Sequence, residues 1–92
     1  MSVRVARSVI VSGRVQGVAY RWYAREAAFE LGVDGWVRNL PDGRVEVHLE
    51  GEPAAVESMV ERLRAGSPAA RVRGIEASDA SAAGLRGFEV RR

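Results

Sequence analysis

The stretch VSGRVQGVAYRWYAREA, residues 11–27, passes from a strand-like to a helix-like pattern through a loop that contains glycine. The segment leading into it, residues 4–13, is rich in β-branched residues and ends in glycine, which predicts a strand. After the loop, apolar residues recur with helical spacing, which predicts a helix over residues 20–31 that ends at Gly32. The residues on that helical face are Tyr20, Ala24, Ala27, Ala28 and Leu31.

The rest of the chain extends this unit to the order β-α-β-β-α-β with one further short strand. The segment RVEVHLE, residues 44–50, alternates apolar and polar residues strictly and is the clearest half-buried strand. It follows the turn LPDG, residues 40–43, and should pair with a strand at 33–39 as a hairpin. The remaining predictions are a helix over 52–66, strands over 70–77 and 87–92, and a mobile surface loop over 78–87.

Each predicted helix has a single apolar face, so both helices should lie on the same side of one sheet. This arrangement is an α+β fold, a two-layer ferredoxin-like sandwich with two helices on one face of an antiparallel sheet. A chain of 92 residues is long enough for one modest core, so we expect a single domain over residues 1–92.

Composition excludes several kinds of chemistry. The chain has no cysteine and no lysine, which excludes disulfides, thiolate metal sites, and cysteine or lysine nucleophiles. The net charge of +2 is too small to imply nucleic acid as a partner. No apolar run approaches a membrane span, and the first residues do not resemble a signal peptide. We therefore expect a cytoplasmic protein that binds neither a membrane nor nucleic acid. We also expect a monomer, although nothing in the sequence determines the oligomeric state.

The loop before the first helix has the features of an anion site. A helix N-terminus presents unpaired N–H groups, and a tight loop before it can add more. Gly17 has no Cβ to keep a ligand away, and Arg21 in the first helical turn can donate two hydrogen bonds to phosphate oxygens. The same residues also fit a plain turn and an arginine paired with a surface acid. Asn39, before a Pro-Asp-Gly turn, equally fits a simple turn residue.

Two motifs resemble the acylphosphatase family. GRVQGVAYR, residues 13–21, is similar to that family's signature, and GWVRNLPDGRVEV, residues 35–47, is similar to its second signature block. VESMVERL in the second helix and GFEV near the C-terminus also match, so the resemblance covers nearly the whole chain. It implies an enzyme that hydrolyses acyl phosphates, the mixed anhydrides of carboxylic and phosphoric acids, without metal, cofactor or covalent intermediate.

The resemblance also implies roles for individual residues. Arg21 would be the phosphate-binding arginine, and Asn39 would hold the attacking water. The phosphate-cradling loop would consist of Val15, Gln16, Gly17, Val18 and Ala19. Many relatives carry an aromatic or larger residue at the position of Ala19, so this position leaves the leaving-group preference open.

Four other residues could carry function, but structural roles explain them better. His48 is the only histidine and has no second metal ligand at suitable spacing, so we expect a solvated or helix-edge residue. Trp22, Tyr23 and Trp36 could line a substrate site, and we expect them to pack in the core instead.

Two other functions fit the same topology. An RNA-recognition module needs aromatic residues on its central strands for base stacking, and the segments RSVIVS and VEVHL have none. A catalytically silent anion-binding or regulatory module of the same fold is the alternative to an enzyme. The presence of both Arg21 and Asn39 favours the enzyme.

Overall fold

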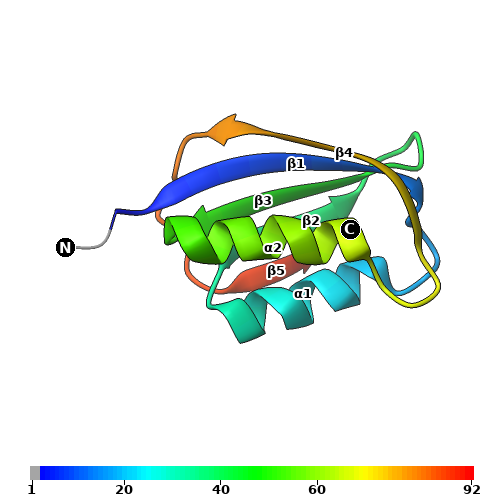
Figure 1. Ribbon diagram of the computed structural model, residues 1–92. Helices are drawn as coiled ribbons and strands as arrows, with labels where there is room; N and C mark the ends of the chain where they lie inside the picture. Colours follow the sequence, from blue (N-terminus) through cyan, green and yellow to red (C-terminus); the bar gives the residue numbers. More distant parts are fainter. Residues whose placement is uncertain (1–2) are drawn as a thin grey trace.

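The structure, a computed structural model, describes residues 3–92, which form five strands and two helices (Figure 1). In chain order these elements are β1 (Val5–Arg14), α1 (Tyr20–Leu31), β2 (Asp34–Asn39), β3 (Val45–Gly51), α2 (Pro53–Ala65), β4 (Arg71–Ala80) and β5 (Phe88–Arg91). The order confirms the predicted β-α-β-β-α-β pattern with an additional C-terminal strand.

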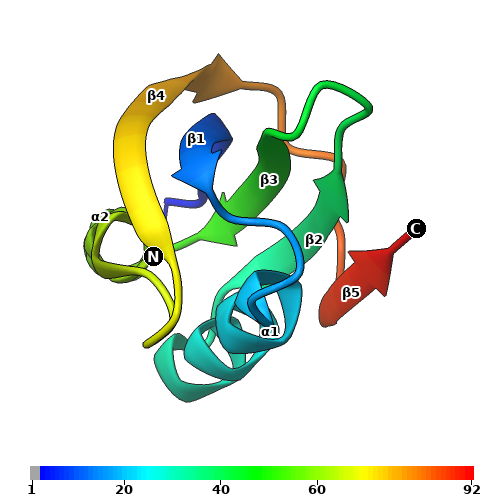
Figure 2. The same cartoon turned by 90° about the vertical axis from the view of Figure 1, so that its right-hand side faces the viewer.

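The strands form one sheet in the order β4-β1-β3-β2-β5, and both helices cover the same face of it (Figures 1 and 2). This confirms the two-layer ferredoxin-like sandwich. The sheet differs from the prediction at one edge, because β5 pairs with β2 in parallel while the other three pairs are antiparallel. The last residue of β4 and the first residue of β2 lie at the same end of the sheet. The chain crosses this end from β4 to β5, and β5 therefore runs in the same direction as β2.

The core lies between the sheet and the helices, where the predicted apolar faces meet. In α2 the buried residues are Val56, Met59, Val60 and Leu63. In α1 they are Tyr20, Ala24, Ala27 and Ala28, as the helical spacing predicted. From β1 and β3 the fully buried side chains are Val9, Val11, Val45, Val47 and Leu49.

β1 ends one residue later than predicted, at Arg14. Gly13, the last residue of the predicted strand, lies at a shift of register between β1 and β4 with φ of 123°. A Cβ at this position would clash with the carbonyl oxygen of Arg71. Gly13 therefore allows close pairing with β4, and the loop consists of residues 15–19.

β4 is also longer than predicted. Residues 78–80, which we assigned to a mobile loop, continue the strand, and Ser78, Asp79 and Ala80 pair with Ser8, Arg7 and Ala6 of β1. Their small and polar side chains gave no strand signal. The backbone of β1 provides the pairing partners whatever those side chains are.

Two tyrosine hydroxyls fix the start of α1 against the end of α2. Tyr20 donates a hydrogen bond to the carbonyl oxygen of Leu63 at 2.6 Å, and Tyr23 donates to that of Arg62 at 2.9 Å. Both carbonyls belong to the last turn of α2, where Arg62 also accepts a hydrogen bond from the N–H of Gly66 at 3.0 Å. The tyrosines therefore hold the N-terminus of α1 in a defined position.

The prediction that the tryptophans pack in the core is wrong. Trp22 is 58% exposed on α1, because it lies next to the buried stripe and not within it. Trp36 lies on the helix-free face of the sheet, since its neighbours Gly35 and Val37 point inward. There its ring stacks on His48 with centroids 5.8 Å apart. Tyr23 is half-buried at the helix interface.

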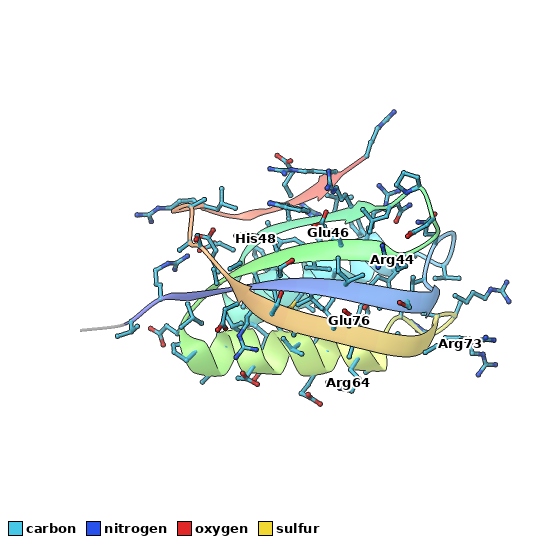
Figure 3. All side chains as sticks on the ribbon, turned by 90° about the horizontal axis from the view of Figure 1, so that it is seen from above. Arg44, Glu46, His48, Arg64, Arg73 and Glu76 are labelled. Atoms are coloured by element: carbon cyan, nitrogen blue, oxygen red, sulfur yellow. The ribbon has the colours of Figure 1, made fainter. Side chains whose placement is uncertain are left out.

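His48 is not the solvated or helix-edge residue that we expected. It lies on the helix-free face with Arg44 and Glu46 (Figure 3), but its side chain is only 14% exposed. Its Nε2 lies 2.6 Å from Oε2 of Glu50, whose side chain is fully buried. The other partners of this carboxylate are the backbone N–H groups of Ala83, Gly84 and Leu85, at 2.7, 3.1 and 3.1 Å.

These contacts reverse the usual effect of burial on a carboxyl group. Burial alone would raise the pKa of Glu50, but the N–H groups of Ala83 and Leu85 and the hydrogen bond with His48 lower it to about 2. Glu50 is therefore a carboxylate at neutral pH. It holds the connection between β4 and β5 against the sheet.

Candidate active site

A cavity of about 280 Å³ opens at the end of the molecule where the loop of residues 15–19 leads from β1 into α1. Figure 2 looks onto this end, with the loop in front, the β2–β3 hairpin to one side and the end of β5 nearby. The predicted site residues that line the cavity are Val15, Gln16, Gly17, Ala19, Arg21 and Asn39. Val18 does not line it and instead borders a neighbouring groove.

The loop exposes backbone to this cavity. Gly17 has φ of 73°, and nothing lies within 4 Å of the position that a Cβ would take there. Ala19, directly before α1, has φ of 59° and is the one residue other than glycine with positive φ in the described part of the chain. Such strain is characteristic of functional sites. Among residues 3–92, the N–H groups of residues 15–19 donate no backbone hydrogen bond, so they are free for a ligand.

Arg21 is held by the last strand. Its Nη1 donates a hydrogen bond to the carbonyl oxygen of Arg91 at 2.7 Å. No ion pair with Arg21 occurs within residues 3–92, which leaves its positive charge without a carboxylate partner. β5 therefore fixes the direction of the guanidinium without neutralising it.

Asn39 is the last residue of β2, on the same face of the sheet as Val37, and it lines the same cavity. Its Oδ1 is buried and accepts no hydrogen bond, the single buried side-chain atom in this state within residues 3–92. Buried polar atoms are nearly always paired, so an orphaned acceptor in a cavity indicates a partner outside the chain. A simple turn residue would instead use its side chain to hold the turn.

Gln16 connects the loop to the hairpin that bears Asn39. Its Nε2 donates hydrogen bonds to the carbonyl oxygens of Leu40 and Arg44, at 2.8 and 2.9 Å. The hairpin closes between the same two residues, where the N–H of Leu40 donates to the carbonyl of Arg44 at 2.8 Å. Sequence spacing gave no signal for this link, because the partners are 24 and 28 residues away.

The cavity has no side chain suited to proton transfer. None of its lining residues is Asp, Glu or His. Tyr20 lines it, but burial raises the pKa of Tyr20, and its hydroxyl already donates to Leu63. No group of three metal-ligating side chains occurs within the described residues. The arrangement can bind an anion and orient a water, but not act as a general acid or base.

Comparisons with known proteins agree with this geometry. The sequence model of the acylphosphatase family matches residues 7–90. The chain belongs to the acylphosphatase family. It is 55% identical over 92 residues to an acylphosphatase from Anaeromyxobacter dehalogenans, covering 99% of each chain. It is 54% identical to one from Natronomonas pharaonis, covering 100% of each.

The fold agrees as closely. The crystal structure of acylphosphatase from Bacillus subtilis matches with a TM-score of 0.93 at 37% identity, covering 96% of this chain and 99% of that one. These matches confirm the predicted family, fold and acylphosphatase enzyme. Neither helix within residues 3–92 is long and apolar enough to span a membrane. The roles of Arg21, Asn39 and the loop stay predictions.

Proposed function

We propose that the chain hydrolyses acyl phosphates to a carboxylate and inorganic phosphate in the cavity formed by the loop of residues 15–19, Arg21 and Asn39, and that it needs no metal. The observation that carries the proposal is the buried, unpaired Oδ1 of Asn39 in the same cavity as a guanidinium that has no carboxylate partner. The Oδ1 of Asn39 can accept a hydrogen bond from a water, and the guanidinium of Arg21 can bind a phosphate.

The phosphate would be bound by the unpaired N–H groups of the loop, by the N-terminus of α1 and by Arg21. Phosphoryl transfer depends mainly on positioning and on stabilising charge on the phosphate oxygens. Because the hydrogen bond to Arg91 already holds Arg21 in place, little reorganisation is needed when the phosphate binds.

The water would donate a hydrogen to Oδ1 of Asn39 and direct a lone pair at phosphorus. A bond forms between the water oxygen and phosphorus, and the bond from phosphorus to the acyl oxygen breaks. The carboxylate leaves with that electron pair, and a phosphate oxygen takes the proton, which gives dihydrogen phosphate. A carboxylate is a weak base, so its departure needs no general acid, in agreement with a cavity that has none.

Hydrolysis of benzoyl phosphate in EDTA tests the proposal, with the wild type compared with Arg21→Gln and Asn39→Ala. Each variant should lose about 10²–10³-fold in kcat/KM, the effect of removing one well-placed polar group from a preorganised site. Arg64→Gln, on the exposed surface of α2, is the matched control and should keep full activity. Circular dichroism checks that every variant is folded.

A folded but inactive wild type would contradict hydrolysis and support the silent anion-binding module. The proton route has its own test, because a pH–rate profile that requires a deprotonated protein group would contradict transfer to the phosphate. All residues of the proposed site come from one chain, so we also propose that the protein is a monomer. We further propose that it is cytoplasmic, acts on a free small molecule and does not bind nucleic acid. Sedimentation velocity tests the monomer.

A further inference from the structure

An apolar groove of about 430 Å³ adjoins the candidate site and has no role in the mechanism above. It shares Ala19 and Trp22 with the cavity. Its other walls include Val18, Tyr23, Pro68 and Ala69, and its lining is almost entirely apolar. A substrate that extends across Ala19, whose side chain is a single methyl group, passes from the cavity that contains Arg21 and Asn39 into an apolar groove.

The walls of this groove are fixed in place. The Ser67 hydroxyl donates a hydrogen bond to the carbonyl oxygen of Val18 at 2.9 Å, which joins the segment after α2 to the phosphate loop. On the other side, the guanidinium carbon of Arg25 lies 4.9 Å from the centre of the Trp22 ring. A cation at this distance from a tryptophan ring is attracted to its face and restrains its orientation. The indole is thus held in place although it is 58% exposed.

The loop has one side toward Asn39 and the other toward the groove. Gln16 is hydrogen-bonded to the hairpin that bears Asn39, whereas Val18 is hydrogen-bonded to Ser67 beside the groove. Figure 2 shows the hairpin and the yellow segment after α2 on opposite sides of the loop and the start of α1. In phosphoryl transfer the attacking and leaving oxygens lie roughly in line on opposite sides of phosphorus. A water at Asn39 therefore directs the leaving acyl group toward the groove.

On the basis of the proposed function, we propose that this groove binds the acyl group, and that the chain prefers acyl phosphates whose acyl group is aromatic or a long alkyl chain over acetyl-sized ones. Trp22 provides the apolar surface on which such a group lies. Glu26 also lines the groove, and its charge is opposed by that of Arg25 beside Trp22. The apolar lining of the groove therefore selects apolar acyl groups.

The test measures kcat/KM for benzoyl phosphate and for acetyl phosphate and compares their ratio between variants. Ala69→Asp places a charge in the groove, and Ala54→Asp, at the exposed start of α2, is its matched control. Both substrates carry the same phosphate, so a long-range effect of the new charge on phosphate binding cancels in the ratio. Ala69→Asp should lower the ratio of benzoyl to acetyl about tenfold, and Ala54→Asp should leave it within about twofold.

A second pair of variants avoids any dependence on the new charge. Trp22→Ala should lower the ratio about tenfold, equivalent to about 1.4 kcal/mol. Phe29→Ala removes an aromatic ring that is 86% exposed on the same helix and should leave the ratio unchanged. An unchanged ratio in both groove variants would overturn the proposal, as would a parallel loss on both substrates. A third variant, Val90→Asp, places a charge on the β5 side of the cavity. If the ratio changed in this variant and in neither groove variant, the proposal would also be overturned.

Failure of the proposed function would be visible separately. If the folded wild type hydrolysed neither substrate, binding of benzoyl phosphonate and acetyl phosphonate, which cannot be hydrolysed at a bridging oxygen, would test the groove alone. The indole N–H resonance of Trp22 should shift with the benzoyl compound and much less with the acetyl compound. Trp36, on the helix-free face, is the internal reference. Equal shifts with both compounds, or no shift of Trp22, would contradict an acyl subsite.

Discussion

The loop of residues 15–19 and the connection at residues 83–85 use similar backbone chemistry at opposite ends of the sheet. In the connection, three successive N–H groups donate hydrogen bonds to the buried carboxylate of Glu50, and His48 provides a fourth contact. In the loop, N–H groups lie beside Arg21 and Asn39, but no side chain of the described residues occupies the position of the anion. The N–H groups of the connection are paired with a side chain of the protein, whereas those of the loop are unpaired within residues 3–92.

The difference separates a site that stabilises the fold from the site that we propose to bind substrate. A fully paired buried carboxylate fixes the segments around it, and removing it leaves several donors unpaired. An open site keeps polar groups unpaired and a backbone residue strained, which costs stability until a ligand binds. Substitutions at Glu50 should therefore act on unfolding, whereas substitutions at Asn39 should act on catalysis.

The largest expected effect is at Asn39. Asn39→Leu has nearly the same size but no oxygen to hold a water, so hydrolysis of benzoyl phosphate should fall by about 10²-fold or more. Its free energy of unfolding should stay the same or rise by about 1 kcal/mol, because the substitution removes a buried, unpaired acceptor. Steady-state kinetics and urea unfolding of the same preparations measure both quantities. A clear loss of stability would show that Asn39 has a structural role.

Glu50→Ala should have the opposite pattern. It leaves the N–H groups of Ala83, Gly84 and Leu85 without their acceptor, and we expect the free energy of unfolding to fall by about 3 kcal/mol. Glu76→Ala is the matched control, since Glu76 is exposed on β4, and its effect should stay below about 0.5 kcal/mol. Equal unfolding midpoints for the two variants would contradict the stabilising role of Glu50.

The spacing of apolar residues along the chain predicted the strands and helices whose burial follows that spacing. Alternation of Val45, Val47 and Leu49 defined β3, and helical spacing defined the buried faces of α1 and α2. The helical spacing also contained the information that Trp22 lies outside the buried stripe, which an expectation based on residue type alone overlooked. The motif resemblance selected Arg21 and Asn39, and the fold brings them to one cavity.

Contacts between distant segments were not predictable in this way. Alternation placed Glu50 correctly on the helix-free face, but its burial comes from residues 83–85, more than thirty positions away. The strand character of residues 78–80 comes from the backbone of β1 and not from their own side chains. The link from Gln16 to the hairpin depends equally on the complete fold.

The pKa of Glu50 predicts a pH dependence of stability. Its folded-state pKa is lowered from 4.5 to about 2, so the carboxylate stabilises the folded state above pH 4.5 and loses this effect as the pH falls toward 2. Between pH 6 and pH 3 the wild type should lose about 2 kcal/mol more of its free energy of unfolding than Glu50→Gln, which has no titratable group there. Urea unfolding at both pH values measures the difference, and parallel losses would contradict the lowered pKa.

The smallest expected effect is at Gln16, which is internally paired like Glu50 but belongs to the open site. Gln16→Ala removes two hydrogen bonds between the loop and the hairpin, so the loop and Asn39 are no longer held together, and kcat/KM should fall about tenfold. Gln16→Glu should be worse, because it places a carboxylate against the carbonyl oxygens of Leu40 and Arg44. If Gln16 acts by positioning, kcat should fall by a larger factor than the inhibition constant of inorganic phosphate rises. If phosphate inhibition weakened by the same factor as kcat/KM fell, Gln16 would instead bind the anion itself, and the positioning role would be wrong.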